Sequence, residues 1–446
     1  MKQYPGSRLQ GRDYYGKQGI TWPWVTVKGF NARVLEANTL FANISPLIPI
    51  ESDNKSDDGL GTLYSLLAFL NSSVVSAFLD LVTPSRNYTT GQVNALPWPS
   101  TDVDSLADLG RQAHTLKAQW DTGNEICTKF SAPLLIQIAK GDLSLLDGTA
   151  VGPDCSLSSL VEFALKAESE RDTKLRQIQT SVDEKVYELY GISLEDRALI
   201  ERELGKRPRE IVWPYAEKLG RKQKAAEHIA RLMSHFLLQA IKADPDGIIP
   251  ITEGTGYPTV LMAVRAGLEK QFGEAAAFQM ETDAAAYLGR PLADWLTKSF
   301  WKDYHVKWYK NHPVLWQLQS QKGQFACLVT IHKLGRDTLS KVRTQYLWTV
   351  RNAMQEELES ARREESEGNK SAARRVANLE AALDDLLAFD SALTDVIEAR
   401  VKCDVPEWAQ GPYRKGGYDP VLDDGVAVNI LPLQAAGLLA KRVVSG

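Results

Sequence analysis

Residues 14–35 read YYGKQGITWPWVTVKGFNARVL. Within this stretch, ITWPWVTV and ARVL are rich in β-branched and aromatic residues, a composition that favours strands separated by polar breaks. Lysine and arginine side chains are interleaved with four aromatic rings, those of Tyr14, Tyr15, Trp22 and Trp24. The stretch therefore predicts a β-containing domain that begins with a basic and aromatic segment.

The segment LGTLYSLLAFLNSSVVSAFLDLV (60–82) predicts one or two apolar helices joined at Asn71-Ser72-Ser73, because serine and asparagine suit a helix cap. The next residues, TPSRNYTTGQ (83–92), predict a loop. VNALPWPS (93–100) contains two prolines and predicts a short extended segment.

From about residue 103 the apolar pattern is helical. Ser159 followed by Glu162 predicts a capping box at the start of a helix that ends at Gly191, and Ser193 predicts the cap of the next helix. A third helix is predicted over roughly 221–243, before the turn ADPDG.

Residues 246–335 show a mixed pattern, with strands predicted in DGIIPIT and QFACLVTIHKL and helices in TVLMAVRAGLEKQF and PLADWLTKSFW. From 336 to 402, apolar residues recur at helical spacing on both sides of the polar segment REESEGNKSA. This pattern predicts a long antiparallel helical hairpin. The structural interpretation of this hairpin is a spacer with a solvated face of mixed charge. The alternative is that Arg336, Lys341 and Arg343 at its base contact a DNA backbone.

These patterns together predict an α+β fold with a mixed, β-containing domain, a helical spacer and a long antiparallel helical hairpin. The predicted divisions are 1–102 and 246–335 for the two parts of the mixed domain, 103–245 for the spacer, 336–402 for the hairpin and 403–446 for a tail that packs back on the core.

The chain has 446 residues, of which 44% are hydrophobic and 24% charged, as in an ordinary globular protein of roughly two to four domains. No apolar run approaches the ~20 residues of a membrane span, and MKQYPGSRLQGRDYYG lacks the apolar core of a signal peptide. The four cysteines are far apart and form no CxxC pair, which suits a reducing compartment. We therefore expect a cytoplasmic protein without a membrane partner.

The formal net charge of −4 excludes a globally basic nucleic-acid binder. Residues 1–50 nevertheless carry six basic and two acidic side chains, a local charge of +4. Contacts to phosphates supply most non-specific DNA affinity. The basic segment is thus a candidate for DNA contact, although an ordinary solvated surface fits the charge equally well.

Motifs for catalysis are missing from the sequence. The six histidines have no metal-ligand spacing, and the nearest pair, His228 and His235, fits a helix surface better than a metal site. Gly254-Thr255-Gly256 follows a strand-like segment but lacks the third glycine of a dinucleotide fingerprint. We expect no catalytic residue, no metal and no bound cofactor in this chain.

The opening stretch, followed by LLAFLNSSVVSAFLDLVTPSRNYTTGQVNALPWP, resembles the target-recognition region of large adenine-specific DNA methyltransferases of bacterial phage defence, the PglX family of BREX systems and the related DISARM methylase. HPVLWQLQSQKGQFACLVTIHKLGRDTLSKVRTQYL, the hairpin and the closing LDDGVAVNILPL follow the family's order. The resemblance assigns 1–102 and 246–335 to the recognition domain.

The departure from the family is large. Its catalytic domain, with a glycine-rich loop for S-adenosylmethionine and an N-P-P-Y/F motif that holds a flipped adenine, has no counterpart here, and the chain contains no Pro-Pro at all. The resemblance therefore implies the specificity portion of a restriction-modification type enzyme, with S-adenosylmethionine bound in a separate catalytic domain or subunit. Double-stranded DNA, that catalytic part and other defence-system proteins are the implied partners.

If the resemblance holds, lysines and Arg33 contact phosphates, while amides and forked guanidinium groups read base edges. Tyr88 is expected to pack on a sugar or a thymine methyl. Trp22 or Trp24 is better explained as core, Asn71 as a helix cap and Asn87 as a turn residue. The DNA-binding candidates are Lys17, Thr21, Lys28, Asn31, Arg33, Arg86, Asn87, Tyr88 and Gln92.

Two further functions compete with DNA recognition. One is a helical scaffold that binds subunits of a defence complex and touches DNA little. The other is a self-sufficient methyltransferase with degenerate motifs, which the missing adenine-holding tetrapeptide disfavours.

Overall fold

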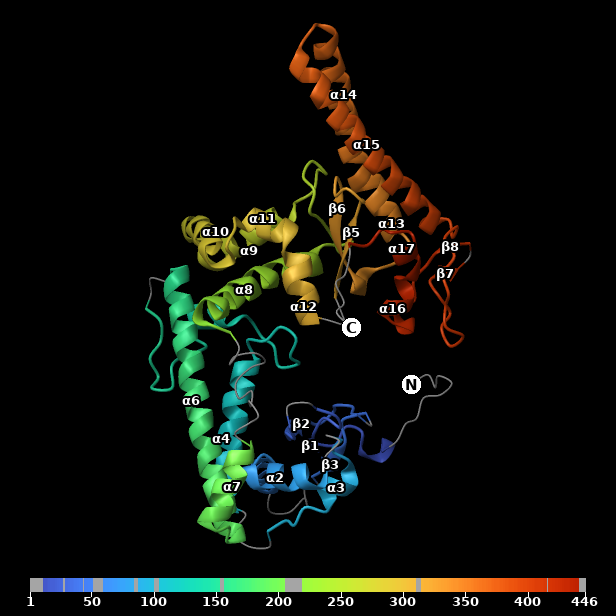
Figure 1. The fold of residues 1–446 in the computed structure, drawn as a ribbon. Coiled ribbons are helices and arrows are strands. Elements are labelled where there is room, and N and C mark those ends of the chain that lie inside the picture. Colours follow the sequence, from blue (N-terminus) through green and yellow to red (C-terminus); the bar gives the residue numbers. More distant parts are fainter. Residues whose placement is uncertain are drawn as a thin grey trace. The chain divides into compact units, whose positions relative to one another are not determined.

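A computed structural model describes residues 11–26, 29–42, 44–50, 59–83, 87–99, 104–152, 156–204, 219–309, 314–414 and 416–440 (Figure 1). The chain divides into two compact units, Met1–Gly152 with Glu162–Lys224 and Pro153–Val161 with Ala225–Gly446. Each unit combines helices with small antiparallel sheets, which confirms the predicted α+β class.

The sheet of the first unit has the strand order β2-β1-β3 and is antiparallel throughout. Its strands are β1 (Gly19–Thr21), β2 (Arg33–Leu35) and β3 (Leu47–Pro49), of which β1 and β2 lie at the stretches ITWPWVTV and ARVL where strands are predicted. β1 lies between the other two, and a Cβ atom on Gly19 would overlap the carbonyl oxygen of Ile48 in β3. Close backbone approach therefore requires glycine at this position.

Two apolar helices form the centre of the first unit, α1 (Leu60–Leu70) and α2 (Ser73–Val82). They are separate helices, which confirms the predicted break: the Ser72 hydroxyl accepts a hydrogen bond from the Val75 N–H at 3.3 Å. Their buried faces share one core with Ile20, Trp22 and the apolar side of α6. The other helices of this unit are α3 (Thr90–Asn94), α4 (Asp104–Asp121), α5 (Leu134–Ala139), most of α6 (Leu157–Tyr190) and α7 (Leu194–Leu204).

The observed helix ends agree with the predicted ones at two positions and differ from the prediction at two others. Gly191 ends α6 with φ of 60°, and Ser193 caps α7 through the Asp196 N–H at 3.1 Å, as predicted. The start of α6 is capped by Ser156, whose hydroxyl accepts from the Ser159 N–H at 3.1 Å, so the predicted cap at Ser159 is wrong by three residues. The predicted loop over 83–92 is also wrong at its end, since Thr89 caps α3.

The second unit is built on an antiparallel sheet of order β4-β6-β5. β4 (Ile248–Pro250) and β6 (Ala326–Thr330) are the two predicted strands, whereas β5 (Leu315–Gln319) was not predicted. Leu315, Trp316, Gln317 and Leu318 are all buried, so β5 lacks the alternation that identifies a strand. Near the C-terminus the chain returns to β5, where the Gln319 N–H donates to the Leu438 carbonyl at 2.9 Å.

Helices flank this sheet, and α9 and α11 lie where the sequence predicts helices. The polar and apolar sides of α8 are both largely buried, which is unusual for a surface helix. The helices are α8 (Arg221–Ala243), α9 (Val260–Phe272), α10 (Glu274–Leu288), α11 (Leu292–Lys298), α12 (Val306–Tyr309), α13 (Thr338–Lys341), α16 (Val426–Asn429) and α17 (Leu431–Ala435), with π-helical segments at Phe300–His305 and Val342–Leu347. Short elements complete the chain: 3₁₀ turns at Arg12–Tyr14, Ile331–Lys333 and Leu422–Asp424, and the ribbon β7 (Tyr413–Arg414) with β8 (Gly417–Tyr418).

The predicted antiparallel helical hairpin is confirmed as α14 (Trp348–Ser366) and α15 (Lys370–Ile397), which project from the rest of the second unit (Figure 1). Leu358, Ala361, Val376 and Leu383 are buried between its two helices. By length and composition, no single helix in the described ranges can cross a membrane, although α1 and α2, bent by 61° relative to each other, pass that test as a pair.

Candidate DNA-recognition surface

An aromatic core supports the segment that carries most of the predicted DNA contacts. Trp22 is 1% exposed, and its indole Nε1–H donates to the Tyr88 carbonyl at 2.8 Å. The Tyr88 N–H donates in turn to the Trp24 carbonyl at 2.7 Å, and the rings of Tyr88 and Phe30 meet edge to face with centroids 5.3 Å apart. The indole of Trp22 is therefore core, as the sequence analysis favoured for one of the two tryptophans.

The chain leading into β2 alternates strictly between core and surface. Phe30 and Ala32 are buried, whereas Asn31 is half-exposed and Arg33 is exposed. Period-two alternation places Asn31 and Arg33 on the same outer face. The Arg33 Nε–H donates to the Asn31 Oδ1 at 3.1 Å. Within the described part of the chain, the terminal Nη atoms of Arg33 make no hydrogen bond, so its guanidinium fork remains available.

Asn71, at the end of α1, holds the backbone of Ala32 in the position that this alternation requires. Its Oδ1 accepts from the Ala32 N–H at 3.0 Å, and its Nδ2 donates to the Ala32 carbonyl at 3.0 Å and to the Leu67 carbonyl at 2.9 Å. The side chain thus pairs with both backbone groups of Ala32 as a neighbouring strand would. Asn71 positions the face that carries Arg33, in addition to ending α1 as predicted, and nothing in the local sequence indicated this long-range contact.

Thr21 joins the same face through strand pairing. Thr21 and Arg33 are direct partners in the antiparallel β1–β2 pair, so their side chains point to one side of the sheet. The Thr21 hydroxyl is buried and has no hydrogen-bond partner among the described residues. The structure therefore brings together three candidates, Thr21, Asn31 and Arg33, of which Thr21 is the least accessible.

The remaining described candidates lie in different settings. Lys17 is exposed, with its ammonium 5.2 Å from the centre of the Tyr14 ring. Asn87 is exposed and forms an antiparallel bridge with Val25, which is 63% exposed. Val25 is not one of the predicted DNA contacts, although an exposed aliphatic side chain beside an amide suits contact with a thymine methyl.

Tyr88 and Gln92 differ from their expected roles. Tyr88 is 0% exposed, so its ring cannot pack on a sugar or a base, and it acts as a core residue that positions Trp22 and Trp24. The Gln92 carboxamide accepts from the Thr89 N–H at 2.9 Å and donates to the Val82 carbonyl at 3.4 Å, which makes it half of a capping box. Lys28 and Arg86 lie outside the described residues.

Charged groups of α4 and the following loop border Arg33. Glu36, near the end of β2, forms an ion pair with Lys129 at 2.9 Å and lies 3.9 Å from His114. Burial lowers the pKa of His114 below its ordinary value, and the Glu36 carboxylate opposes part of that shift. Burial raises the pKa of Asp121, and the positive charges of Lys117 and Arg33 oppose it. The surface around Arg33 is thus mixed in charge rather than uniformly basic.

At the base of the hairpin, two of the three basic residues that are candidates for DNA contact form ion pairs with acidic side chains of this chain. Lys341 forms an ion pair with Asp246. Arg343 pairs with Asp390 at 2.8 Å and lies over the Trp348 ring at 4.9 Å. Side chains that are fixed in this way favour the structural interpretation of the hairpin base over DNA contact.

Two curated proteins match the chain along most of its length. It is 24% identical over 455 residues to the adenine-specific methyltransferase BrxX of Escherichia coli O9:H4 (strain HS), covering 92% of this chain and 37% of that protein. It is 22% identical over 466 residues to the adenine-specific methyltransferase PglX of Lacticaseibacillus casei (strain Zhang), covering 96% of this chain and 36% of that protein. The chain thus spans little more than a third of the length of these relatives. No family model matches it.

Proposed function

We propose that this chain is the DNA-recognition portion of a site-specific adenine-N6 DNA methyltransferase of a phage-defence system. The observation that carries the proposal is the face on which Asn31 and Arg33 stand side by side above a buried aromatic core. An amide suits adenine and a guanidinium fork suits guanine in the major groove. The similarity of the chain to two relatives that are both named adenine-specific methyltransferases also supports the proposal.

Lys17, Lys28 and Arg86 take the role of phosphate contacts, which set the register of the protein on DNA without reading its sequence. Asn31, Arg33 and Asn87 take the role of base contacts, with Val25 beside Asn87 as an apolar contact. Tyr88 and Asn71 act as positioning residues beneath and beside this surface.

We assign the binding of S-adenosylmethionine to a separate catalytic part. The loop with Gly254 and Gly256 follows β4, but β4 pairs antiparallel with β6 rather than in the parallel sheet of a nucleotide-binding fold. Helix α9 begins only at Val260 and has its own cap in Thr259, which accepts from the Met262 N–H at 3.5 Å. These features do not fit a binding site for S-adenosylmethionine. They support the proposal that this chain recognises DNA and that a separate catalytic part transfers the methyl group.

A fluorescence-anisotropy titration with random duplex DNA at about 50 and about 200 mM salt tests the proposal. We expect affinity to fall steeply with salt. The double variant Arg33→Ala/Arg86→Ala should bind more weakly and with a shallower salt dependence, because it loses the phosphate contact assigned to Arg86. Arg202→Ala/Arg363→Ala removes the same charge from two exposed positions elsewhere and serves as the control. Binding that is absent at both salt concentrations, or equally weak in both double variants, would contradict the proposal.

The alternative, a scaffold for partner proteins, is favoured by one observation. Residues 348–397, which form the hairpin, contain six basic and eleven acidic residues, a formal charge of −5. Such a surface repels a DNA backbone. An interaction role for the hairpin is compatible with DNA recognition by the first unit.

A further inference from the structure

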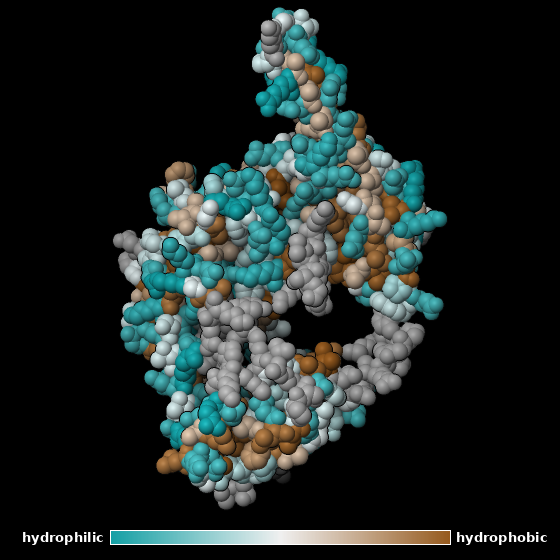
Figure 2. All heavy atoms as spheres, in the orientation of Figure 1, coloured by the Kyte–Doolittle hydropathy of each residue, from teal (hydrophilic) through white to brown (hydrophobic). Residues whose placement is uncertain are grey.

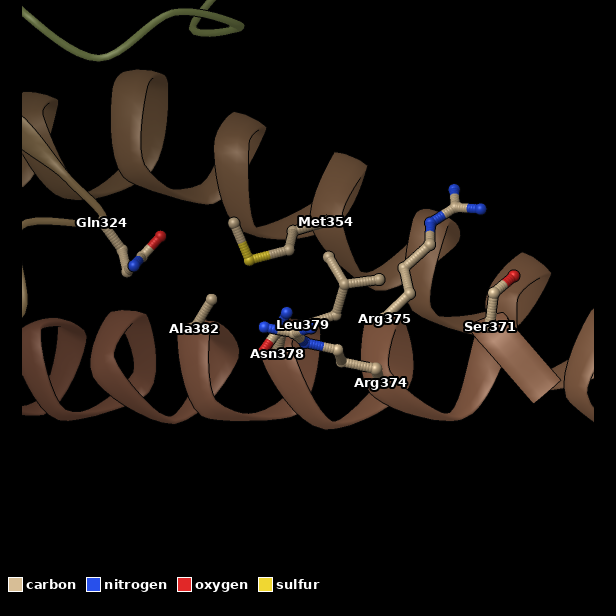
Figure 3. A pocket seen from close by; sticks show the side chains of 8 residues that line it. All are labelled: Gln324, Met354, Ser371, Arg374, Arg375, Asn378, Leu379 and Ala382. Atoms are coloured by element: carbon tan, nitrogen blue, oxygen red, sulfur yellow. The ribbon is translucent and has the colours of Figure 1, made fainter.

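A groove runs along the hairpin of the second unit and has a volume of about 480 Å³ (Figure 3). Its floor is apolar and consists of Met354 from α14 with Leu379 and Ala382 from α15. Arg374 and Asn378 line it from α15, one helical turn apart, so their side chains occupy the same face. Gln324, in the turn between β5 and β6, lines it as well.

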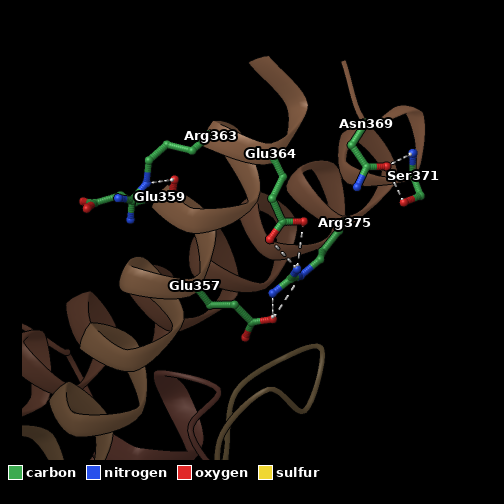
Figure 4. A network of polar contacts seen from close by, with 7 residues as sticks. All are labelled: Glu357, Glu359, Arg363, Glu364, Asn369, Ser371 and Arg375. Carbon is green, nitrogen blue, oxygen red and sulfur yellow. Dashed lines mark hydrogen bonds and ion pairs between the residues drawn. The ribbon is translucent and has the colours of Figure 1, made fainter. Parts of the chain in front are cut away.

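The arginines of this hairpin differ in their surroundings. Arg375 is held by Glu357 at 3.0 Å and by Glu364 at 3.4 Å (Figure 4), and Arg362 is held by Glu380 at 2.7 Å. Arg374 makes no hydrogen bond or ion pair with any described residue. Its side chain extends along the groove beside Asn378 in Figure 3. The groove therefore presents one uncompensated positive charge above an apolar floor.

The groove is held rigidly at its inner end. The carboxylate of Asp385, 5% exposed, accepts from the Lys322 N–H at 2.9 Å and from the Gln324 N–H at 3.3 Å. These bonds fix the β5–β6 turn against α15. A ligand that enters a preformed groove loses less free energy to ordering the protein.

The chemistry of the lining selects one kind of occupant. A flexible thioether beside aliphatic side chains accommodates an aliphatic side chain of varied shape. A guanidinium next to a carboxamide binds a carboxylate by charge-assisted hydrogen bonds. Duplex DNA fits poorly, because its row of phosphates would meet the charges of the whole hairpin, which sum to −5, whereas a single carboxylate meets only Arg374 and Asn378. Hydrophilic side chains cover much of the hairpin surface that Figure 2 shows.

We infer that this groove is a docking site for a segment of a partner protein that presents an aliphatic side chain next to an aspartate or glutamate. Met354, Leu379 and Ala382 receive the aliphatic group, and Arg374 with Asn378 binds the carboxylate. The groove is formed by residues of the second unit and Asn31 and Arg33 belong to the first, so the inference does not depend on DNA recognition.

Selection of random peptides displayed on phage against the full chain, with removal of peptides that also bind Asn378→Trp, tests the inference. Asn378 is exposed, so a tryptophan at this position fills the groove without entering the core, and an unchanged thermal midpoint verifies the fold of the variant. We expect the retained peptides to share an aliphatic residue beside an acidic one. No enrichment over the variant, or enrichment of peptides without an acidic residue, would overturn the inference.

Methyl NMR then locates the binding of an enriched peptide. The Met354 methyl signal, assigned through Met354→Leu, is expected to shift on titration. Arg374→Gln should weaken binding about tenfold, as should replacing the acidic residue of the peptide with its amide. Arg363→Gln is the matched control, because Arg363 donates to the Glu359 carbonyl at 3.3 Å (Figure 4) and is not one of the residues that line the groove. A Met354 shift with duplex DNA but not with the peptide, or equal binding by both arginine variants, would refute the assigned occupant.

Discussion

Asn71 and Ala32, 39 residues apart, form a two-bond pair in which an amide side chain satisfies both backbone groups of its partner. The pair joins the end of α1 to the residue that precedes Arg33. It therefore couples the helical core of the first unit to the proposed DNA-reading face.

Replacement of Asn71 tests this coupling. We expect Asn71→Leu to lower the free energy of unfolding by about 2 kcal/mol, because the N–H and C=O of the buried Ala32 lose their partner. Denaturant unfolding followed by tryptophan fluorescence measures the change. Asn94→Leu, at an exposed position of α3, should change it little. Equal losses in the two variants would contradict the role of Asn71.

A second prediction concerns the indole of Trp22. Trp22→Phe keeps an aromatic ring in the core but removes the hydrogen bond to the Tyr88 carbonyl. We expect a loss of about 2–3 kcal/mol from the unsatisfied carbonyl and the smaller ring. Trp98→Phe, at a side chain that is 40% exposed, is the comparison, and calorimetric unfolding is the measurement.

Gly19 and Gly91 should respond in opposite ways to alanine. A Cβ atom at Gly19 meets the Ile48 carbonyl oxygen, whereas a Cβ atom at Gly91 in α3 meets no atom within 4 Å. We expect Gly19→Ala to separate β1 from β3 and to expose the amides of both strands to hydrogen exchange. Gly91→Ala should leave exchange unchanged or slow it, because alanine favours a helix by about 1 kcal/mol over glycine. Unchanged exchange in Gly19→Ala would show that the strands do not pack as described.

The base of the hairpin depends on Asp390. Its carboxylate accepts from Arg343 at 2.8 Å, from the Trp348 indole at 2.9 Å and from Arg351 at 3.4 Å. Asp390→Asn should destabilise the second unit by about 3 kcal/mol, since two partly buried arginines lose their counter-charge. Asp384→Asn, at an exposed position of α15, is the control. Limited proteolysis should cut α15 faster in the first variant only.

His114 predicts a pH dependence of stability. Burial holds its pKa in the folded chain below the ordinary 6.5, so the unfolded chain binds the proton more readily. The stability that His114 provides is thus complete above pH 6.5 and is lost as the pH falls through that value toward the folded pKa. His114→Gln should reduce the drop in thermal midpoint between about one unit above and about one unit below pH 6.5. The exposed His332→Gln is the comparison; the same reduction in both variants would rule out this role.

Sequence patterns predicted the local features and missed the long-range ones. The helix break at Ser72, the end of α6 at Gly191 and the hairpin follow from caps and periodicity, which act within a few residues. The strand β5 was not predicted, because both of its faces are buried and its sequence therefore does not alternate between apolar and polar residues.

The residues of the candidate site also fall into those that local sequence patterns predicted and those whose roles depend on long-range contacts. Asn31 and Arg33 follow from residue chemistry, and strand alternation places them together. The burial of Tyr88 and the pairing of Asn71 with Ala32 depend on contacts between distant segments, which spacing does not encode. Gln92 was assigned to DNA because an amide side chain can pair with adenine, although Thr89 and Gln92 have capping-box spacing.

Site-specific photo-crosslinking tests the central claim most directly. A benzophenone amino acid replaces Asn87 or Lys17, two exposed residues to which the proposal assigns DNA contacts, and Leu199, which is 49% exposed on α7, in a control protein. After irradiation with labelled duplex DNA at low salt, we predict crosslinks from positions 87 and 17 and none from position 199. Crosslinks of equal yield at all three positions, or from position 199 alone, would contradict the assignment of this part of the first unit to DNA recognition.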